Sequence, residues 1–434
     1  MTRKIHVSLG SRRLPVGTLL FDERYPKETH FAYCDSYLTT HDGPRFAISP
    51  DLPLRSGWQT VRQGVRSSPC PLSISDTEPG AWSLRVLDRL WAKGHSTRAD
   101  SDTSTPSVID QLLAVDDFSR MGALRFSDEQ TPLPAERAAR LQTPTTRDLP
   151  TLFRACRRIE LDRETEEDLL YLEGRGTSLG GARPKCSVIN RAGRLCLAKF
   201  DSLADQRDIA KGEVLALTLA RLCGLQAANA ERCSIDGVSA SIIERFDRDA
   251  ACEKRIPYLS ASAFLMRTEE DDPPASYLDL LEALINQGAD WRATAEELLR
   301  RILFNVLINN TDDHSRNTGL LMTGSQTWTL SPAFDINPVP LKRPSSPYAS
   351  KLYLLDDEPA ESITQIIDRA DYFGLNAKEA LKLLQPMIPI LTDWRRIAKS
   401  PAIGMTTTDL NAYTLAFEHD RIAEAKALLA RAGF

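Results

Sequence analysis

The sequence predicts an α+β fold in which a β-rich front part and a small sheet-plus-helix lobe precede a large helical lobe. Short apolar runs alternate with turn residues up to about residue 90, and strand-like runs flank a long helical pattern between residues 185 and 246. Beyond residue 260, apolar residues recur at three- and four-residue spacing. A chain of 434 residues exceeds one ordinary core, and we expect three parts, residues 1–110, 111–250 and 251–434.

In the front part, the apolar runs His6–Leu9 and Val16–Phe21 enclose turn residues and predict a hairpin. Helical spacing predicts a helix over Trp82–Lys93. The stretch Ser96–Ser107 is rich in Ser, Thr and Asp, which is typical of an exposed loop. Its last residues predict an N-cap for a helix over Val108–Val115.

The same periodicities predict the remaining elements. In the middle part we expect helices over Leu152–Leu172 and Leu203–Cys223, and strands over Lys185–Ile189, Leu195–Phe200 and Val238–Phe246. In the last part we expect helices over Tyr277–Ile285, Ala293–Asn309, Ala377–Leu391 and Thr408–Ala432.

Composition and charge argue against several classes of protein. A net charge of −5 does not fit a dedicated DNA binder. No segment approaches the roughly 20 apolar residues of a membrane span, and the N-terminus lacks a signal-peptide core, so we expect a cytoplasmic protein without membrane contact. The eight cysteines form no C-x-x-C pair, which predicts reduced thiols, and the six histidines are too dispersed for a metal cluster.

Three polar residues carry the clearest chemical pattern. Asp312 and Asn317 follow a strongly apolar helical stretch, and Asp335 comes 18 residues after Asn317. Phosphoryl transfer needs a carboxylate near the attacking hydroxyl and oxygen ligands for Mg²⁺. A D-x-x-x-x-N loop with a second Asp downstream is the arrangement that kinase-like folds use. The same spacing is common in ordinary turns, so the interpretation depends on the other motifs.

Two further features fit ATP. The glycine-rich run Gly174–Gly181 is suited to wrap phosphates, although it matches no standard phosphate loop and also fits a flexible surface loop. Lys199 ends an apolar strand, where a buried ammonium is costly unless an anion meets it. Glu213 in the following helix is its candidate partner. The alternative is that Lys199 reaches water at the strand end.

The order of these features favours one chemistry. The strand Ile242–Arg248 ends in alternating charges, as expected where a kinase-like chain passes between lobes and offers backbone groups to adenine. The features follow one another along the chain in this order: the glycine-rich loop, the strand lysine, the helix glutamate, the hinge strand, the catalytic loop and the metal-binding aspartate. Together they predict a protein kinase that uses ATP and Mg²⁺.

On these residues the chain resembles the HipA toxin kinases of bacterial toxin–antitoxin modules, over nearly its whole length. The segments that carry the resemblance are Val16–Leu19, Ser49–Leu54, Asp116–Phe126, Ser178–Lys185, Glu244–Arg248, Asn310–Asn317 and Pro332–Asp335. The resemblance implies a bilobal kinase-like fold with a β-rich N-terminal subdomain and a large helical C-terminal lobe. Asp76–Ser83 departs from the family pattern, which leaves target choice and partner contacts open.

The resemblance also implies residue roles and partners. Asp312 would be the general base, Asn317 and Asp335 the magnesium ligands, and Ser178 a site of inhibitory autophosphorylation. The implied ATP contacts are Gly180, Gly181, Ala182, Arg183, Pro184, Lys185, Lys199, Glu244, Arg245, Phe246, His314, Arg316, Asn317 and Phe334. The implied partners are a small helix-turn-helix antitoxin like HipB, through which alone DNA is contacted, and a protein substrate such as an aminoacyl-tRNA synthetase.

Two other functions remain open from the sequence. The catalytic loop also resembles the D-x-H-x-x-N loop of phosphoinositide kinases, so a lipid or small-molecule kinase is one alternative. A non-catalytic co-repressor subunit is the other, although the presence of Lys199, Asp312, Asn317 and Asp335 argues against it.

Overall fold

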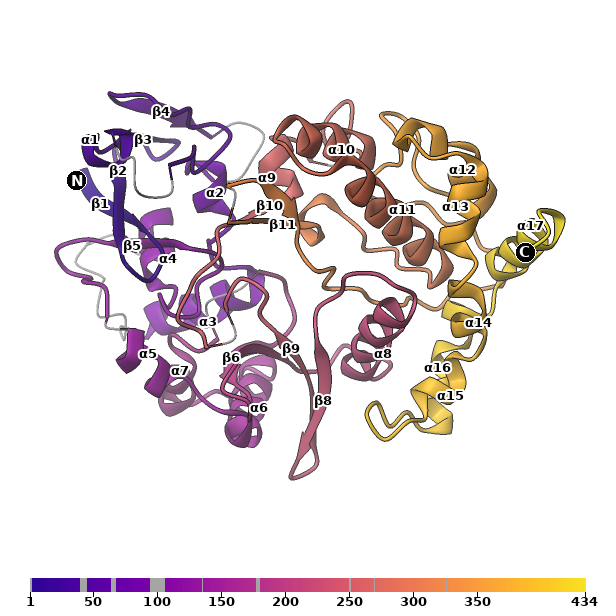
Figure 1. Cartoon of the computed structure of the whole chain (residues 1–434). Coiled ribbons are helices and arrows are strands. Elements are labelled where there is room, and N and C mark those ends of the chain that lie inside the picture. Colours follow the sequence, from indigo (N-terminus) through magenta and orange to yellow (C-terminus); the bar gives the residue numbers. More distant parts are fainter. Residues whose placement is uncertain are drawn as a thin grey trace. The chain divides into compact units, whose positions relative to one another are not determined.

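The computed structural model describes residues 2–39, 45–63, 68–93, 106–134, 136–176, 180–249, 251–268, 270–324 and 326–434. The chain divides into two units (Figure 1). The first consists of Met1–Ala204 and Cys233–Leu259, and the second of Asp205–Arg232 and Ser260–Phe434. The division into residues 1–110, 111–250 and 251–434 stays a prediction.

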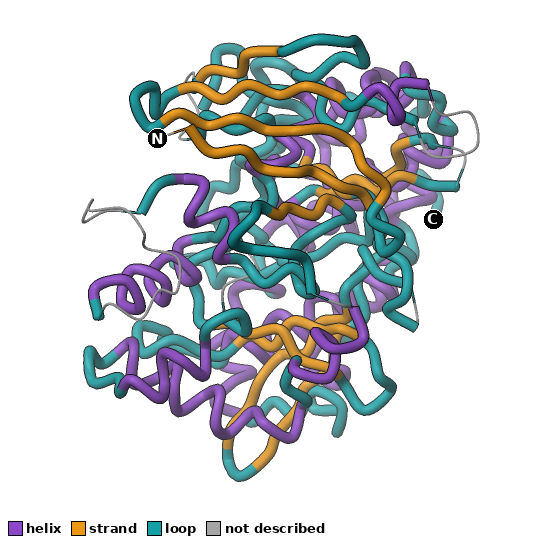
Figure 2. The backbone as a smooth tube through the Cα atoms, turned by 90° about the vertical axis from the view of Figure 1, so that its left-hand side faces the viewer, coloured by secondary structure: helices purple, strands orange, loops and turns teal. Residues whose placement is uncertain are grey.

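The first unit contains a five-stranded antiparallel sheet, whose strands lie side by side near the N-terminus (Figure 2). In the spatial order β4-β3-β2-β1-β5, its members are β1 (Thr2–Leu9), β2 (Leu14–Asp22), β3 (Glu28–Tyr33), β4 (Gln59–Arg62) and β5 (Leu124–Ser127). The predicted hairpin is confirmed, with Val7 opposite Gly17. Alternate residues such as Ile5 and Val7 are buried and pack with Leu112 of α4 (Val108–Ala114), which forms one core of this unit.

The first unit also contains a four-stranded sheet that positions the predicted lysine. Its spatial order is β6-β7-β9-β8, with β6 (Lys185–Ile189), β7 (Leu195–Lys199), β8 (Ala230–Ile235) and β9 (Val238–Glu244). The three strands predicted here are confirmed, and β8 was not predicted. The other helices of this unit are α1 (Asp35–Thr39), α2 (Leu72–Ser75), α3 (Ala81–Ala92), α5 (Glu136–Gln142), α6 (Leu149–Glu160) and α7 (Glu166–Leu172).

Two helix predictions in this unit are confirmed, α3 and α4, and one is wrong. Ser107 caps α4 and exchanges hydrogen bonds with Asp110, as the sequence predicted. The single helix predicted over Leu152–Leu172 is two helices. The backbone of Asp162 takes a left-handed φ of 54° after α6, and Thr165 starts α7 with its own capping box.

The second unit is mostly helical. It contains α8 (Ile209–Leu222), α9 (Ala261–Leu265), α10 (Tyr277–Asn286), α11 (Trp291–Leu307), α12 (Ile363–Asp368), α13 (Ala377–Leu384), α14 (Met387–Thr392), α15 (Trp394–Ala398), α16 (Thr407–Phe417) and α17 (Asp420–Arg431). Its strands β11 (Gly319–Met322) and β12 (Trp328–Leu330) pair antiparallel, and β10 (Tyr258–Ser260) lies at the border of the units. The predicted α10 and α11 are confirmed and pack together (Figure 1).

Three helix boundaries differ from prediction for local reasons. Helix α8 begins at Ile209 instead of Leu203 because the Asp208 side chain accepts a hydrogen bond from the Lys211 N–H and caps the first turn. The stretch predicted over Ala377–Leu391 is divided at Pro386, which has no N–H to donate. The stretch predicted over Thr408–Ala432 is divided at His419, whose backbone is extended.

The sheets and helices together confirm the predicted α+β class. In the part of the chain that the structure describes, no helix combines the length and the apolar character that a membrane crossing requires.

Candidate active site

The loop after α11 brings Asp312 and Asn317 together. The side-chain amide nitrogen of Asn317 donates to the backbone oxygen of Asp312 at 3.0 Å. The Asn317 N–H donates to the His314 oxygen at 2.8 Å and closes a 3₁₀ turn over Ser315–Asn317. The Asp312 side chain is 54% exposed. The loop thus presents a carboxylate to solvent beside an amide whose nitrogen is engaged and whose oxygen can serve as a ligand.

Buried polar groups fix the start of this loop. The side-chain amide nitrogen of Asn309 donates to the Val339 oxygen, and the Arg421 guanidinium donates to the Asn309 Oδ1 at 2.8 Å. The Tyr348 hydroxyl donates to the backbone oxygen of Asn310 at 3.0 Å. Because these groups are buried, losing any of them would leave an unsatisfied partner, and the loop therefore starts from a rigid base.

Asp313 differs sharply from its exposed neighbour. It is 5% exposed, and its Oδ2 accepts a hydrogen bond from the Tyr277 hydroxyl at 2.6 Å. Burial raises the pKa of the Asp313 carboxyl to about 6, although hydrogen bonds from Tyr277 and Asn305 oppose that shift. No role was predicted for Asp313 from the sequence, because its spacing to Asn317 fits no motif.

A further residue contacts the predicted base. Lys351 Nζ lies 2.5 Å from Asp312 Oδ1, and its side chain is half exposed. Lys351 was not predicted from the sequence, because it stands 39 residues after Asp312 in a stretch without a recognisable pattern.

The other predicted residues of this unit lie in or near two loops. His314 is half-buried and Arg316 is exposed, both in the loop of Asp312. Asp335 has a left-handed φ of 54°, which is uncommon for a residue with a side chain. Phe334 precedes it, and Ala333 forms backbone hydrogen bonds with Gln226 and Ala228. Asp adopts this conformation more readily than most residues, and Asp162 has the same φ after α6.

The donor set of these loops fits magnesium. Mg²⁺ prefers oxygen ligands, keeps several waters and usually takes only one or two carboxylates. Asn317 and Asp335 offer an amide oxygen and a carboxylate. Among the described residues, no three His, Cys, Asp or Glu side chains gather in a way that could hold a metal. The assignment of Asn317 and Asp335 as the magnesium ligands stays a prediction.

In the first unit, Lys199 has a second lysine as its neighbour. Lys199 ends β7 and is 9% exposed, and it pairs directly with Lys185 of β6, which is 6% exposed. Paired positions on antiparallel strands direct their side chains to the same face of the sheet. The sheet therefore carries two lysine side chains on one face at one of its ends.

The glycine loop before β6 is built around Lys185. Its ammonium group donates to the Gly180 oxygen. Gly181 has a φ of 94°, a backbone conformation that residues with side chains rarely adopt, so glycine is favoured there. The Gly181 oxygen accepts from the Trp82 N–H at 3.1 Å.

Ala182, Arg183 and Pro184 lead from this loop into β6, and the Pro184 oxygen accepts from the Phe200 N–H at 3.0 Å. Ser178 lies outside the described residues.

The predicted hinge residues follow β9. The Glu244 carboxylate accepts from Arg194 at 3.3 Å and from Asn190 at 3.4 Å. The Arg245 N–H donates to the Leu195 oxygen at 3.0 Å, and the Phe246 ring lies 6.2 Å from the Tyr258 ring. Since the Arg245 N–H is already engaged by Leu195 of β7, its predicted ATP contact would have to come from another atom.

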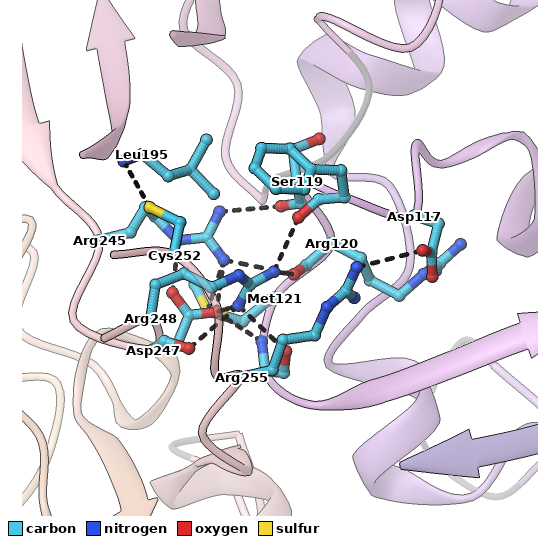
Figure 3. Close-up of polar contacts among 12 residues, drawn as sticks. Asp117, Ser119, Arg120, Met121, Leu195, Arg245, Asp247, Arg248, Cys252 and Arg255 are labelled. Carbon is cyan, nitrogen blue, oxygen red and sulfur yellow. Dashed lines mark hydrogen bonds and ion pairs between the residues drawn. The ribbon is translucent and has the colours of Figure 1, made fainter. Parts of the chain in front are cut away.

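The Arg245 side chain belongs to a buried ion network that the sequence analysis missed (Figure 3). Its guanidinium and that of Arg248 donate to the Asp247 Oδ2 at 2.5 and 2.7 Å, and the Gly122 N–H donates to the same oxygen at 2.6 Å. Burial would raise the pKa of the Asp247 carboxyl, but Arg245 and Arg248 outweigh it and lower that pKa to about 2.

A second part of the network surrounds Asp117. Its carboxylate accepts from Arg125, and from Arg255 at 3.1 Å. Burial again opposes ionisation, and the guanidiniums again keep the pKa of this carboxyl low. The sequence signal that could have indicated this buried network is the presence of charged residues among the apolar residues of Asp116–Phe126.

Glu213, predicted to pair with Lys199, is 2% exposed in α8. Helix α8 belongs to the second unit, whereas Lys199 belongs to the first. Their pairing stays a prediction.

The chain was compared with known protein families and solved structures. Residues 177–394, half of the chain, match the family of HipA-like C-terminal domains. The structure is similar to HipA of Shewanella oneidensis, solved with HipB and operator DNA, at a TM-score of 0.63 and 18% identity over 98% of this chain and 96% of that one. Helicobacter pylori CtkA, a proinflammatory kinase, matches 58% of this chain and 93% of its own at 16% identity, but its TM-score of 0.43 is too low to support a conclusion. No curated protein matches the sequence. On the family match, the chain belongs to the HipA family.

Proposed function

We propose that this chain is a Mg²⁺-ATP-dependent serine/threonine protein kinase that acts as the toxin of a cytoplasmic toxin–antitoxin pair. The observation that carries the proposal is the loop in which exposed Asp312 and hydrogen-bonded Asn317 lie together on a buried, rigid base. The lysines Lys185 and Lys199, which lie opposite each other at one end of a sheet, support it. Membership of the HipA family is consistent with it.

In the proposed reaction Asp312 orients the substrate hydroxyl. The bond from the γ-phosphorus to the β–γ bridging oxygen breaks, and its electron pair leaves with ADP. A bond forms between the hydroxyl oxygen and the γ-phosphorus, and the hydroxyl proton passes to Asp312. Lys199 would contact the phosphates of ATP. Asn317 and Asp335 would hold magnesium, which when bound neutralises charge on the phosphates.

Transfer of labelled phosphate tests this proposal. Wild-type protein given γ-labelled ATP is expected to label itself or proteins of a cell lysate, whereas Asp312→Ala is expected to label neither. Asp368→Ala removes an exposed carboxylate from α12 and is the matched control. Undiminished labelling by Asp312→Ala would exclude Asp312 as the catalytic residue. Labelling of a lipid panel instead of protein would favour a lipid kinase, and failure to bind Mg-ATP by calorimetry would favour a non-catalytic subunit.

The proposal includes regulation at Ser178. Phosphate on Ser178 would alter the segment directly before the loop that Lys185 and Trp82 hold. Mass spectrometry of wild-type protein incubated with Mg-ATP is expected to find that phosphate, and to find none on Asp312→Ala. Phosphate on Asp312→Ala made without another kinase would contradict autophosphorylation.

The proposed partners are a small helix-turn-helix antitoxin and a protein target such as an aminoacyl-tRNA synthetase. The similar Shewanella structure contains HipA, HipB and operator DNA. Expression with a neighbouring helix-turn-helix protein is expected to relieve any growth inhibition and to yield a stable complex. Growth inhibition that persists in the presence of that protein would contradict the assignment of the antitoxin.

A further inference from the structure

The segment that carries Lys351 is held firmly against the catalytic loop. The Leu352 N–H donates to the Asp313 oxygen at 2.7 Å. On the other side of Lys351, the Ser350 N–H donates to the Ala360 oxygen at 3.0 Å, and the Ala360 N–H returns a hydrogen bond to the Ser350 hydroxyl at 2.9 Å. Both neighbours are buried, Ser350 at 5% and Leu352 at 0% exposure.

This anchoring determines where the Lys351 side chain can reach. With Ser350 and Leu352 both turned into the protein, Lys351 projects outward and meets Asp312. The Tyr353 N–H also donates to the Ala275 oxygen at 3.2 Å, and the Tyr277 N–H donates to the Tyr353 oxygen at 2.8 Å, so the register after Lys351 is fixed as well. The backbone that carries Lys351 is therefore fixed beside the catalytic loop, within reach of Asp312.

We propose that Lys351 is a further catalytic residue, whose ammonium group binds the transferred phosphoryl group beside Asp312. This inference rests on the proposed kinase function. A hydroxyl bound to Asp312 lies about one hydrogen-bond length from the γ-phosphorus that it attacks, so phosphoryl oxygens come within reach of a cation that already contacts the carboxylate. An ammonium group has three N–H donors, and the Asp312 contact uses one.

The charge of Lys351 matches what the reaction requires. The transition state spreads negative charge over three equatorial phosphoryl oxygens, and a fixed cation stabilises it in advance. Before ATP binds, the Asp312 carboxylate holds that cation in place. In the transfer described above, Lys351 gives up no proton and forms no covalent bond. It exchanges part of its contact with Asp312 for the phosphoryl oxygens.

The alternative is an ordinary surface ion pair, since the two side chains are 50% and 54% exposed. Such pairs contribute little to stability and nothing to a reaction. The two interpretations differ in the effect of removing the charge, because only a catalytic lysine changes the rate of transfer while the folded protein stays equally stable.

The experiment measures the rate of phosphate transfer from γ-labelled ATP to the chain itself and to lysate protein, over a range of ATP concentrations. Lys351→Met is expected to lower the rate at saturating ATP by about 100-fold. The ATP concentration for half-maximal rate and the unfolding midpoint are expected to stay near those of the wild type. Lys351→Arg keeps the charge and is expected to restore part of the rate. Lys378→Met, at an exposed position of α13, is the matched control.

The outcomes separate this inference from the proposed function. Wild-type protein that transfers no phosphate overturns both. If the wild type and Lys378→Met are active and Lys351→Met is equally active, only the role of Lys351 is overturned. Two other results would also overturn the role of Lys351. One is a rise in the half-saturating ATP concentration at an unchanged maximal rate. The other is a parallel fall of the rate and the unfolding midpoint in both Lys351 variants.

Discussion

Asp247 of the first unit and Asp313 of the second are both buried carboxyls, but their surroundings shift their pKa values in opposite directions. Two guanidiniums meet Asp247 and lower its pKa to about 2, whereas Asp313 meets the neutral Tyr277 hydroxyl and its pKa rises to about 6. Burial raises the pKa of both carboxyls, and at Asp247 the two guanidiniums and their hydrogen bonds outweigh that effect. The first carboxyl is a permanent charge in a structural network, and the second titrates next to the candidate base.

The two carboxyls therefore contribute to stability over different ranges of pH. The contribution of Asp247, whose folded pKa is lowered, is present above the unfolded value near 3.8 and is lost as the pH falls through about 2. The contribution of Asp313, whose folded pKa is raised, is fully present below the unfolded value and is lost as the pH rises through about 6.

The largest expected effect comes from removing the charge of Asp247. Asp247→Asn leaves the guanidiniums of Arg245 and Arg248, whose side chains are 6% and 1% exposed, without their shared carboxylate. We expect the free energy of unfolding at pH 7 to fall by about 3–5 kcal/mol, measured by denaturant titration. Asp368→Asn, at an exposed position, is the control and should change it by less than about 0.5 kcal/mol. An unchanged unfolding midpoint for Asp247→Asn would remove the structural role of the network.

Asp313→Asn tests the other side of the comparison. The amide cannot ionise but still accepts a hydrogen bond from Tyr277, so the pH dependence that Asp313 contributes should disappear. Relative to the wild type, this variant should gain about 2 kcal/mol in free energy of unfolding between pH 4 and pH 7. Denaturant titrations at the two pH values measure that gain. If Asp368→Asn shows the same gain, the pH dependence of stability belongs to a group other than Asp313.

Tyr277→Phe tests how much the Tyr277 hydroxyl stabilises the Asp313 carboxylate. It removes the donor 2.6 Å from the Asp313 Oδ2 and leaves a buried carboxylate less well solvated. We expect a loss of about 1–3 kcal/mol in free energy of unfolding at pH 7. The loss should be smaller at pH 4, where the Asp313 carboxyl is protonated and needs less solvation. An equal loss at both pH values would mean that the hydroxyl acts through packing alone.

The smallest effect is expected at the edge of the first unit. Arg194→Ala removes the 3.3 Å ion pair with Glu244, whose partners are 45% and 24% exposed. We expect a change of less than about 1 kcal/mol in free energy of unfolding, because water screens such pairs. A loss as large as that of Asp247→Asn, measured in the same titration, would show that burial is not what separates the two ion pairs.

Local patterns allowed the sequence to predict much of the fold. Alternation of apolar residues located β6 and β7, and helical spacing located α10 and α11. The breaks inside longer helical patterns were missed, because Pro386 and the capping box of Thr165 occur within runs whose apolar spacing continues. In these places a local stop signal overrides the periodicity.

The candidate site was predictable only where its residues are close in sequence. Asp312 and Asn317 fall within one loop, so their spacing indicated their role. Asp117 and Arg255 are 138 residues apart, and Lys351 lies 39 residues from Asp312. Contacts over such separations depend on the tertiary fold, and spacing along the chain carries no signal of them.

The central claim is that Asp312 promotes phosphoryl transfer from ATP. Single-turnover transfer of labelled γ-phosphate, measured for the wild type and Asp312→Ala at the same ATP and Mg²⁺ concentrations, tests it most directly. We expect the rate of the variant to be lower by about 100- to 10,000-fold, as for loss of a positioned general base, with an unchanged unfolding midpoint. Equal rates for the two proteins would contradict the claim.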